Sequence, residues 1–243
     1  MVKILLRLMN SHFFKNVKWD DFSSAFGTSV ISLFSTKHLE TASINLNESP
    51  FNNLDIETKK IISIGQTHSK NIRISNTAKF YNDADGIINP NGELICSIKV
   101  ADCLPVYFSS KVSNTIGLAH AGWRGLVNGV LLNMLSGFSK IKTDLGSITV
   151  LIGPSINSCC FFVKDDILDL FDKSYIVKEK NKSFSIDLRK MAIDQMVNNG
   201  IRFDNIISID RCTYCDNDRY HSFRREGSKA GRMQAILSRV ITN

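Results

Sequence analysis

From residue 101 to residue 125 the chain reads Ala-Asp-Cys-Leu-Pro-Val-Tyr-Phe-Ser-Ser-Lys-Val-Ser-Asn-Thr-Ile-Gly-Leu-Ala-His-Ala-Gly-Trp-Arg-Gly. Two apolar runs within this stretch, Leu104–Phe108 and Ile116–Ala119, are typical of buried strands. Each run has a chemically reactive side chain at one end, Cys103 before the first and His120 after the second. The stretch therefore predicts two strands that present a thiol and an imidazole at their edges.

A glycine turn follows the second of these strands. At Ala121-Gly122 the strand pattern gives way to a helical one, and Arg124 lies in the first turn of the expected helix. Such a junction exposes backbone N–H groups and the positive end of the helix dipole, which favour an anion. We therefore expect an active site here, with Cys103, His120 and Arg124 as catalytic candidates.

Outward from this stretch, strand-like and helix-like segments interleave along the chain. The predicted strands are 30–35, 43–47, 61–65, 94–100, 148–152 and 206–209, and the predicted helices are 51–60, 126–138, 165–171, 187–198 and 230–241. Because no linker, repeat or low-complexity tract divides residues 1–243, we expect a single α/β (α+β) domain with mixed β-sheet layers covered by helices. Residues 1 to about 25 are poorly periodic and are expected to form an N-terminal extension.

The composition is that of an ordinary globular protein, 43% hydrophobic and 22% charged. No apolar run approaches the roughly 20 residues of a membrane helix. Arg7 interrupts the apolar start of the chain, and no small-residue cleavage site follows it. We therefore expect no membrane segment and a cytoplasmic location.

The net charge of +7 suits either a nucleic acid or a small anionic substrate. The lysines are scattered along the chain, and no aromatic-basic RNA-binding motif is present. We therefore expect no nucleic-acid partner and interpret most of this charge as a solvated surface.

His68 lies just after the predicted strand 61–65 and forms a third candidate with Cys103 and His120. Two imidazoles and a thiolate leave one place open in a tetrahedral zinc site, as in catalytic zinc centres. The spacings of 35 and 17 residues form no local ligand motif, however. Two other interpretations stay open: three unrelated residues with Cys103 a buried small hydrophobe, or a Cys103–His120 nucleophile–base dyad.

Four further cysteines form two short motifs. The CxxC motif Cys212-Thr-Tyr-Cys215 fits half of a structural zinc site, a redox pair or a structural thiol pair. We favour the thiol pair, because the sequence contains no second CxxC. Cys159 and Cys160 are adjacent, and neighbours in a strand point to opposite faces, so we do not expect both to bind one metal.

The C-terminal part of the sequence is rich in arginine beside glycine, with Arg224-Arg225-Glu-Gly227 followed by Gly231-Arg232. Dense arginines of this kind suit the binding of phosphate or carboxylate groups. The alternative is a solvated loop and the start of a helix.

Several of these motifs occur in the order found in the YfiH-type family, which this sequence resembles from roughly Ile31 to Leu237. Its members are described as laccase-domain proteins, multicopper polyphenol oxidases, peptidoglycan editing factors and purine nucleoside phosphorylases. The resemblance rests on six blocks: Gln66-Thr-His68, Ala84-Asp85, Ala101-Asp-Cys-Leu-Pro-Val106, Ala119-His-Ala-Gly-Trp-Arg-Gly125, Ile152-Gly-Pro-Ser155 with Cys159, and Ser222-Phe-Arg-Arg225 with Gly231-Arg-Met233.

The resemblance implies a YfiH-like fold and a Zn²⁺ site whose ligands are His68, Cys103 and His120. A zinc-bound water has a pKa near neutrality and is a usable nucleophile. The implied reactions are phosphorolysis of adenosine, inosine, guanosine and methylthioadenosine, and deamination of adenosine. The implied partners are thus a purine nucleoside and phosphate, and the candidates to bind them are Lys37, Asp85, Arg124, Arg225 and Arg232.

The early block of the family departs from its usual form in this chain. Phe34-Ser-Thr is followed by Lys37-His-Leu, where the family usually has an arginine and then two glycines. If that arginine contacts substrate, Lys37 replaces it only as a flexible point charge, so the substrate range can differ.

Copper is the less favoured metal. A blue-copper centre alone takes two histidines and a cysteine, and a laccase adds an imidazole-rich trinuclear cluster, whereas the whole chain has five histidines. We therefore expect no multicopper oxidase activity. The remaining alternatives are a hydrolase that edits peptidoglycan precursors, a Cys–His hydrolase that uses the Cys103 thiolate, and a non-catalytic binding module.

Overall fold

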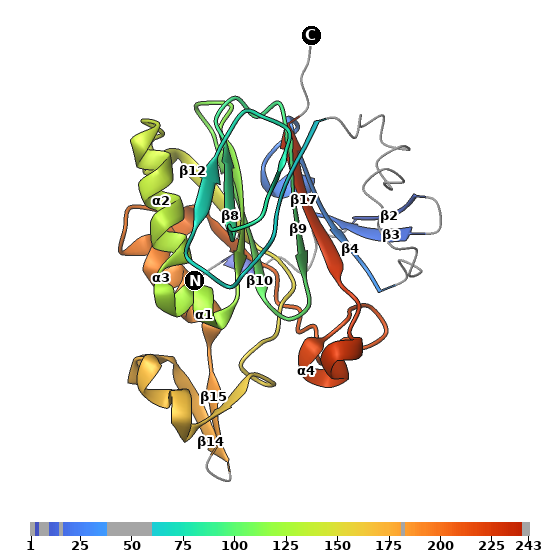
Figure 1. The fold of residues 1–243 in the computed structure, drawn as a ribbon, viewed down its shortest axis with the longest axis vertical. Helices are drawn as coiled ribbons and strands as arrows, with labels where there is room; N and C mark the ends of the chain where they lie inside the picture. Colours follow the sequence, from blue (N-terminus) through green and yellow to red (C-terminus); the bar gives the residue numbers. More distant parts are fainter. Residues whose placement is uncertain (1–2, 5–9, 15–16, 38–59, 181–182, 240–243) are drawn as a thin grey trace.

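The computed structural model describes residues 3–4, 10–14, 17–37, 60–180 and 183–239 (Figure 1). Within these residues the strands form two seven-stranded sheets and one three-stranded sheet. The predicted strand 43–47 and nearly all of the predicted helix 51–60 lie outside the described residues.

The first sheet contains both strands of the stretch 101–125. Its strand order is β1 (Lys3–Ile4), β16 (Ile206–Ser208), β12 (Ile148–Ile152), β10 (Leu104–Ser110), β11 (Ile116–Ala121), β8 (Gly86–Asn89) and β6 (Ile72–Ile74). β10 pairs antiparallel with β11, and this register sets Pro105 opposite His120. Because β12 and β16 pair in parallel, the sheet is mixed, as predicted.

The second sheet runs in the order β2 (Asn10–Phe14), β3 (Val17–Asp21), β4 (Val30–Ser35), β17 (Met233–Arg239), β9 (Ile95–Val100), β5 (Ile61–Ile64) and β7 (Phe80–Tyr81). The predicted helix 230–241 is wrong, because residues 233–239 form β17 in the middle of this sheet. Met233, Ala235 and Leu237 face one core and Ile236 faces another, so both sides of the strand are buried. Its apolar residues therefore do not alternate with polar ones, and Met233 and Leu237 also satisfy helical spacing.

A small third sheet projects from the body of the molecule at the bottom of Figure 1. It consists of β13 (Phe162–Lys164), β15 (Ser183–Ile186) and β14 (Ile176–Lys180). The predicted helix 165–171 lies beside it as a 3₁₀ helix over Asp165–Leu170. Further 3₁₀ helices cover Ser23–Ala25, Leu145–Ser147, Lys173–Tyr175, Phe203–Asn205 and Gly227–Lys229.

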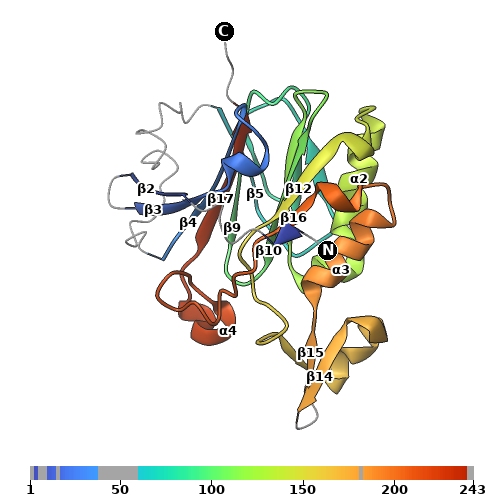
Figure 2. The ribbon, with the colours of Figure 1, turned by 180° about the vertical axis from the view of Figure 1, so that it is seen from behind.

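Helices cover one face of the first sheet, and the second sheet covers the other (Figures 1 and 2). The helices on this face are α1 (Trp123–Asn128), α2 (Val130–Lys140) and α3 (Leu188–Val197), and the short α4 (Phe223–Glu226) lies elsewhere, before β17. In β10, Leu104, Val106 and Phe108 pack in the core under the helices, whereas Tyr107 packs in the core between the sheets. The α/β fold class with mixed sheet layers and a helical cover is therefore confirmed.

A glycine and a capping aspartate set the ends of the helices in two of the predicted helical segments. The predicted helix 126–138 is interrupted at Gly129, whose φ of +89° separates α1 from α2. Asp187 caps α3, because its carboxylate accepts the backbone N–H of Lys190 at 2.9 Å. Among the helices that the structure describes, none combines the length and the apolar character needed to cross a membrane.

Candidate active site

A buried carboxylate organises the loop that carries His68. Asp85 is fully buried, and it accepts the backbone N–H groups of Thr67 at 3.2 Å, His68 at 3.1 Å and Ser69 at 2.7 Å. Gln66 and His68 have φ values of +47° and +58°, which are uncommon for residues other than glycine. The three donated hydrogen bonds hold this strained loop around Asp85 and leave the imidazole of His68 exposed.

The same carboxylate fixes the imidazole of His120 at the end of β11. Asp85 Oδ1 lies 2.7 Å from His120 Nδ1, and His120 is 3% exposed. A carboxylate at this distance accepts the Nδ1 proton, so Nε2 is the nitrogen left to act as a ligand or acceptor. Asp85 therefore orients both histidines, one through its ring and the other through its backbone.

Cys103 is positioned by its neighbour Asp102, which has a φ of +83°. The Asp102 carboxylate accepts the hydroxyls of Thr213 at 2.6 Å and Ser222 at 3.1 Å and the backbone N–H of Arg224 at 2.7 Å. These bonds hold the unusual backbone at the start of β10, which places Cys103 beside the histidines.

His68, Cys103 and His120 lie together, with one ligand atom of each within 4.8 Å of the others. Cys103 Sγ is 3.8 Å from His68 Nε2. A Cβ atom at Gly122 would lie only 2.8 Å from Cys103 Sγ and 3.0 Å from His68 Cδ2, so glycine is needed for this close approach. Two imidazoles, a thiol and a carboxylate behind one imidazole form a donor set that suits a metal such as zinc.

The charges in this group favour a thiolate. Burial alone would raise the pKa of the Cys103 thiol, but His120 and His68 lower that pKa to about 6. Burial would also lower the pKa of His120, but Cys103 and Asp85 raise it to about 9. The thiolate form of Cys103 is therefore favoured, and a thiolate can act either as a metal ligand or as a nucleophile.

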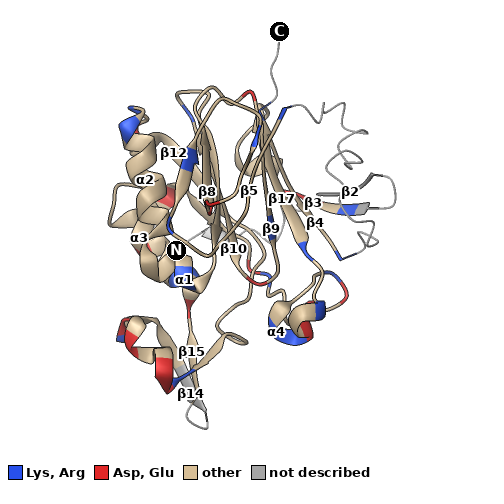
Figure 3. Cartoon of the chain, in the orientation of Figure 1, with Lys and Arg blue, Asp and Glu red and all other residues tan. Residues whose placement is uncertain are grey.

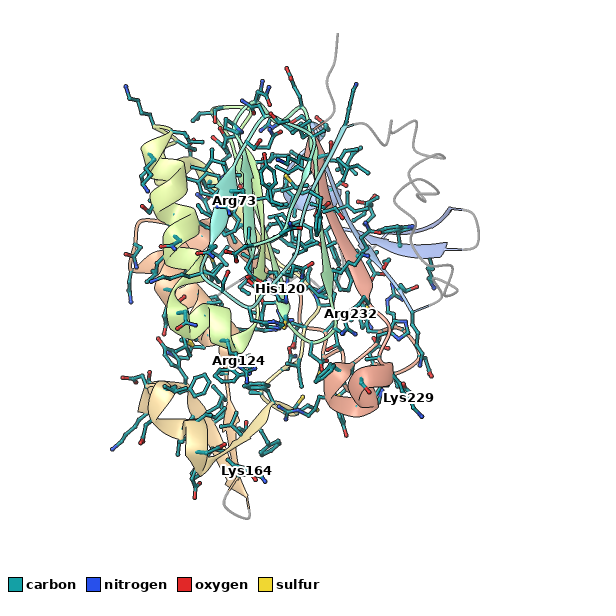
Figure 4. All side chains as sticks on the ribbon, viewed as in Figure 1. Arg73, His120, Arg124, Lys164, Lys229 and Arg232 are labelled. Atoms are coloured by element: carbon teal, nitrogen blue, oxygen red, sulfur yellow. The ribbon has the colours of Figure 1, made fainter. Side chains whose placement is uncertain are left out.

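A cavity of about 560 Å³ opens beside these three residues. This volume is within the usual range for small-molecule sites. Figure 4 shows Arg124 and Arg232 on either side of His120, one from α1 and the other from the segment before β17. The colouring of Figure 3 likewise places basic residues on both α1 and α4.

The cavity wall pairs arginines with aromatic rings. Arg124 stacks on Trp123 at 4.3 Å, Arg224 on Phe161 at 5.1 Å and Arg232 on Phe223 at 5.9 Å, and all six residues line the cavity. Phe223 is 52% exposed, which leaves part of its ring open to a ligand. The wall thus offers cationic groups for an anion and flat apolar faces for a planar ring.

Three of the predicted binding residues do not line this cavity. Lys37 Nζ lies 3.4 Å from the carbonyl and side-chain oxygens of Asn217, and Asp85 is buried behind His120. Arg225 donates to the carbonyls of Thr213 at 2.9 Å and Tyr214 at 2.7 Å, so it holds that loop.

Asp102 and the three aromatic residues of the wall were not among the predicted site residues, and Arg224 was named only as part of the arginine-rich motif. Asp102 directly precedes Cys103 in the sequence, and this adjacency could have identified it as a residue that positions the thiol. Arg224 precedes Arg225 in the same motif, and only the fold decides which of the two faces the cavity.

The placement of Cys159 and Cys160 in a strand is wrong. Residues 158–160 form a turn and not a strand, so the thiols of Cys159 and Cys160 lie on the same side of the chain. Both lie close to Cys212 and Cys215, which are therefore not an isolated thiol pair.

Residues 36–239 match the family described as multi-copper polyphenol oxidoreductase laccase. A purine nucleoside phosphorylase of Clostridium acetobutylicum is 29% identical over 241 residues, covering 96% of this chain and 98% of the relative. One of Staphylococcus saprophyticus is 34% identical, covering 74% and 69%, and YfiH of Escherichia coli, also named a purine nucleoside phosphorylase, is 28% identical, covering 73% of each. These relatives confirm the resemblance to the YfiH-type family.

Solved structures agree with this assignment at the level of the fold. YlmD of Geobacillus stearothermophilus superposes with a TM-score of 0.83 at 22% identity, covering 96% of this chain and 99% of that one. A YfiH protein of Bacillus licheniformis superposes with a TM-score of 0.79 at 23% identity, covering 94% and 98%.

Proposed function

The chain belongs to the multi-copper polyphenol oxidoreductase laccase family, which includes the YfiH-type proteins, and from this premise we propose that it is a zinc-dependent purine nucleoside phosphorylase. We propose adenosine, inosine, guanosine and methylthioadenosine as substrates, with deamination of adenosine as a second activity. The observation that carries the proposal is the meeting of His68, Cys103 and His120 at a cavity walled by paired arginines and aromatic rings.

In this proposal His68 Nε2, Cys103 Sγ and the Nε2 of His120 would hold the metal. When bound, zinc would supply a Lewis acid that polarises a small molecule. Asp85 keeps the proton of His120 on Nδ1 and so keeps Nε2 available. Gly122 leaves the space that Cys103 and His68 need to approach each other.

Phosphorolysis requires a phosphate beside the anomeric carbon of the sugar, where positive charge develops as the bond to the base breaks. Arg124 is the strongest candidate to hold that phosphate, because it is exposed, lines the cavity and is stacked on Trp123. Arg232, from the other side of His120, is a second candidate. A guanidinium binds phosphate with two parallel hydrogen bonds and so also orients it.

The purine is expected to stack on the aromatic wall. Phe223 has the largest exposed face there, and the cavity of about 560 Å³ accommodates a nucleoside together with phosphate. Deamination requires C6 of adenine to face the metal ligands, whereas phosphorolysis requires the anomeric carbon to face the phosphate. The two reactions therefore need the nucleoside at different positions within the cavity.

We do not propose multicopper oxidase activity for this chain. In the described part of the chain, two groups of three or more side chains could hold a metal, and they contain only two histidines, His68 and His120. A trinuclear copper cluster needs many more imidazoles.

A Cys–His hydrolase is the second candidate, including one that acts on peptidoglycan precursors. It is favoured by one observation: Cys103 Sγ lies 3.8 Å from His68 Nε2 and close to His120, and these two imidazoles lower the pKa of the thiol. Such a thiolate is a competent nucleophile without any metal.

The deciding experiment is product analysis on metal-quantified protein with adenosine, in the presence and absence of phosphate. We expect ribose 1-phosphate and adenine only with phosphate, inosine without it, and loss of both activities after chelation with recovery on adding zinc. Hydrolysis that survives chelation would support the thiol mechanism and contradict the proposal. Cys96→Ala, a cysteine change away from the cavity, is the matched control and should leave all products unchanged.

A further inference from the structure

Four of the six cysteines lie in a second cluster, and none of the four lines the cavity. Cys159 and Cys160 come from the turn after residue 157, and Cys212 and Cys215 come from the loop after β16. The four sulfur atoms all lie within 4.8 Å of one another. Residues 52 or more apart in the sequence are thus brought together by the fold.

The backbone pairs the two segments that carry these thiols. Ser155 and Cys212 form a β-bridge, in which Ser155 accepts the N–H of Thr213 at 3.0 Å and donates its own N–H to Arg211 at 3.2 Å. Backbone hydrogen bonds therefore hold together the two segments that carry the thiols.

Three of the sulfur separations are close to those of a tetrahedral metal site, and Cys212 Sγ lies within 4.8 Å of the other three sulfurs. The three separations are 3.5 Å for Cys159–Cys160, 3.7 Å for Cys159–Cys215 and 3.3 Å for Cys160–Cys215. Four sulfurs at about 2.3 Å from one Zn²⁺ lie about 3.8 Å from each other. A disulfide would need one pair at about 2.05 Å, and it would leave the other two thiols without a role.

Backbone donors support a thiolate at Cys212. Its sulfur accepts the N–H of Asn157 at 3.5 Å, and the N–H groups of Tyr214 and Cys215 also point at it. Such donors orient metal-bound sulfur and stabilise its negative charge.

The cluster is coupled to the catalytic loop through neighbouring residues. Arg224 donates to the carbonyls of Cys160 at 3.3 Å and Phe162 at 2.8 Å. Thr213, between Cys212 and Cys215, donates to Asp102 at 2.6 Å. A cross-link at the cluster would therefore hold in place the residues that position Asp102 and, through it, Cys103.

We propose that Cys159, Cys160, Cys212 and Cys215 form a second metal site that binds one Zn²⁺ as a closed, structural tetrathiolate. Binding releases the thiol protons to solvent, and no coordination position remains open for a substrate. This site fastens the turn 158–160 to the loop 211–216. The inference is independent of the proposed activity, because it concerns a different ion on different ligands.

The test is metal quantification on full-length protein purified with reductant. We expect about two zinc ions per chain for the unmodified protein, and about one for either His68→Ala/His120→Ala or Cys159→Ser/Cys215→Ser. Cys159 and Cys215 are exposed, so these serine substitutions do not disturb a core. Cys96→Ala, a buried cysteine outside both groups, is the matched control and should keep both ions.

X-ray absorption on the histidine double variant then identifies the remaining ligands, and it requires no substitution in the cluster. Four sulfurs at about 2.3 Å support the proposal. A zinc-free histidine variant, a remaining zinc with nitrogen or oxygen ligands, or a Cys160–Cys215 disulfide found by peptide mapping would each overturn it. The melting temperature of Cys159→Ser/Cys215→Ser should fall even where the catalytic zinc is retained, because a cross-link between two loops is lost.

Discussion

Gly122→Ala tests whether the close approach of Cys103 and His68 is what the catalytic centre requires. The backbone of Gly122, at φ −69° and ψ 163°, is allowed for alanine, so the change acts through the added methyl group alone. That methyl would lie 2.8 Å from Cys103 Sγ and 3.0 Å from His68 Cδ2. Ordinary contact requires about 3.5–4.0 Å, so the sulfur or the ring must move by roughly 0.7 Å.

A displacement of this size is large for a metal ligand. Misplacing catalytic groups by about 1 Å costs on the order of 100-fold in rate, so we expect kcat/KM to fall about 10- to 100-fold. The zinc concentration that restores half of the activity to chelated protein should rise by a similar factor. The fold should persist, because the atoms that must move belong to Cys103 and His68, which line the cavity.

The assay is steady-state phosphorolysis with a zinc titration, accompanied by a thermal melt. Gly146→Ala is the matched control, because its added Cβ would meet only the flexible Asp144 carboxylate at 3.3 Å and more distant atoms. A Gly122→Ala protein with unchanged kcat/KM and an unchanged zinc requirement would refute the reasoning.

Three further substitutions and one labelling experiment test other parts of the structure. Asp85→Asn removes the negative charge and one of the two oxygens that accept from His120 and the loop, so a zinc titration should show affinity about 10- to 100-fold weaker, whereas Asp83→Asn, an exposed neighbour, should bind zinc normally. Arg124→Ala should raise the KM for phosphate in initial-rate assays, and unchanged phosphate dependence would remove Arg124 from the mechanism. Phe223→Ala should raise the KM for the nucleoside more than the KM for phosphate, which the same assays check. Burial raises the pKa of the Cys96 thiol far above its usual range, so mass spectrometry should find Cys96 alkylated only after unfolding.

Local signals predicted much of the scaffold of this protein. Asp187 and Gly200 mark the ends of α3, and the apolar runs on either side of the polar loop 109–115 form β10 and β11. These elements are set by capping, turn residues and periodicity, which act over a few neighbouring residues. The strand at 233–239 was mistaken for a helix, because burial on both faces removes the alternation that distinguishes a strand.

The candidate site was predicted unevenly for a similar reason. The ligand triad was identified through a resemblance, since its spacings of 35 and 17 residues carry no local signal. The aromatic–arginine pairs of the wall come from α1, α4 and the loops beside them, and no local pattern joins them. Lys37 and Arg225 matched expected motifs, but the fold engages them with backbone carbonyls outside the cavity wall.

By itself the sequence determined which residues have the chemistry to act: three ligands for one metal, a helix start with an arginine, and a set of thiols. Only the tertiary structure decided which of them meet. The antiparallel register of β10 and β11 brings Cys103 to His120, and the bridge at Ser155 brings two pairs of cysteines into one cluster. The physical reason is that turns and helix caps depend on adjacent residues, whereas a metal site depends on sheet register and loop pairing across the whole chain.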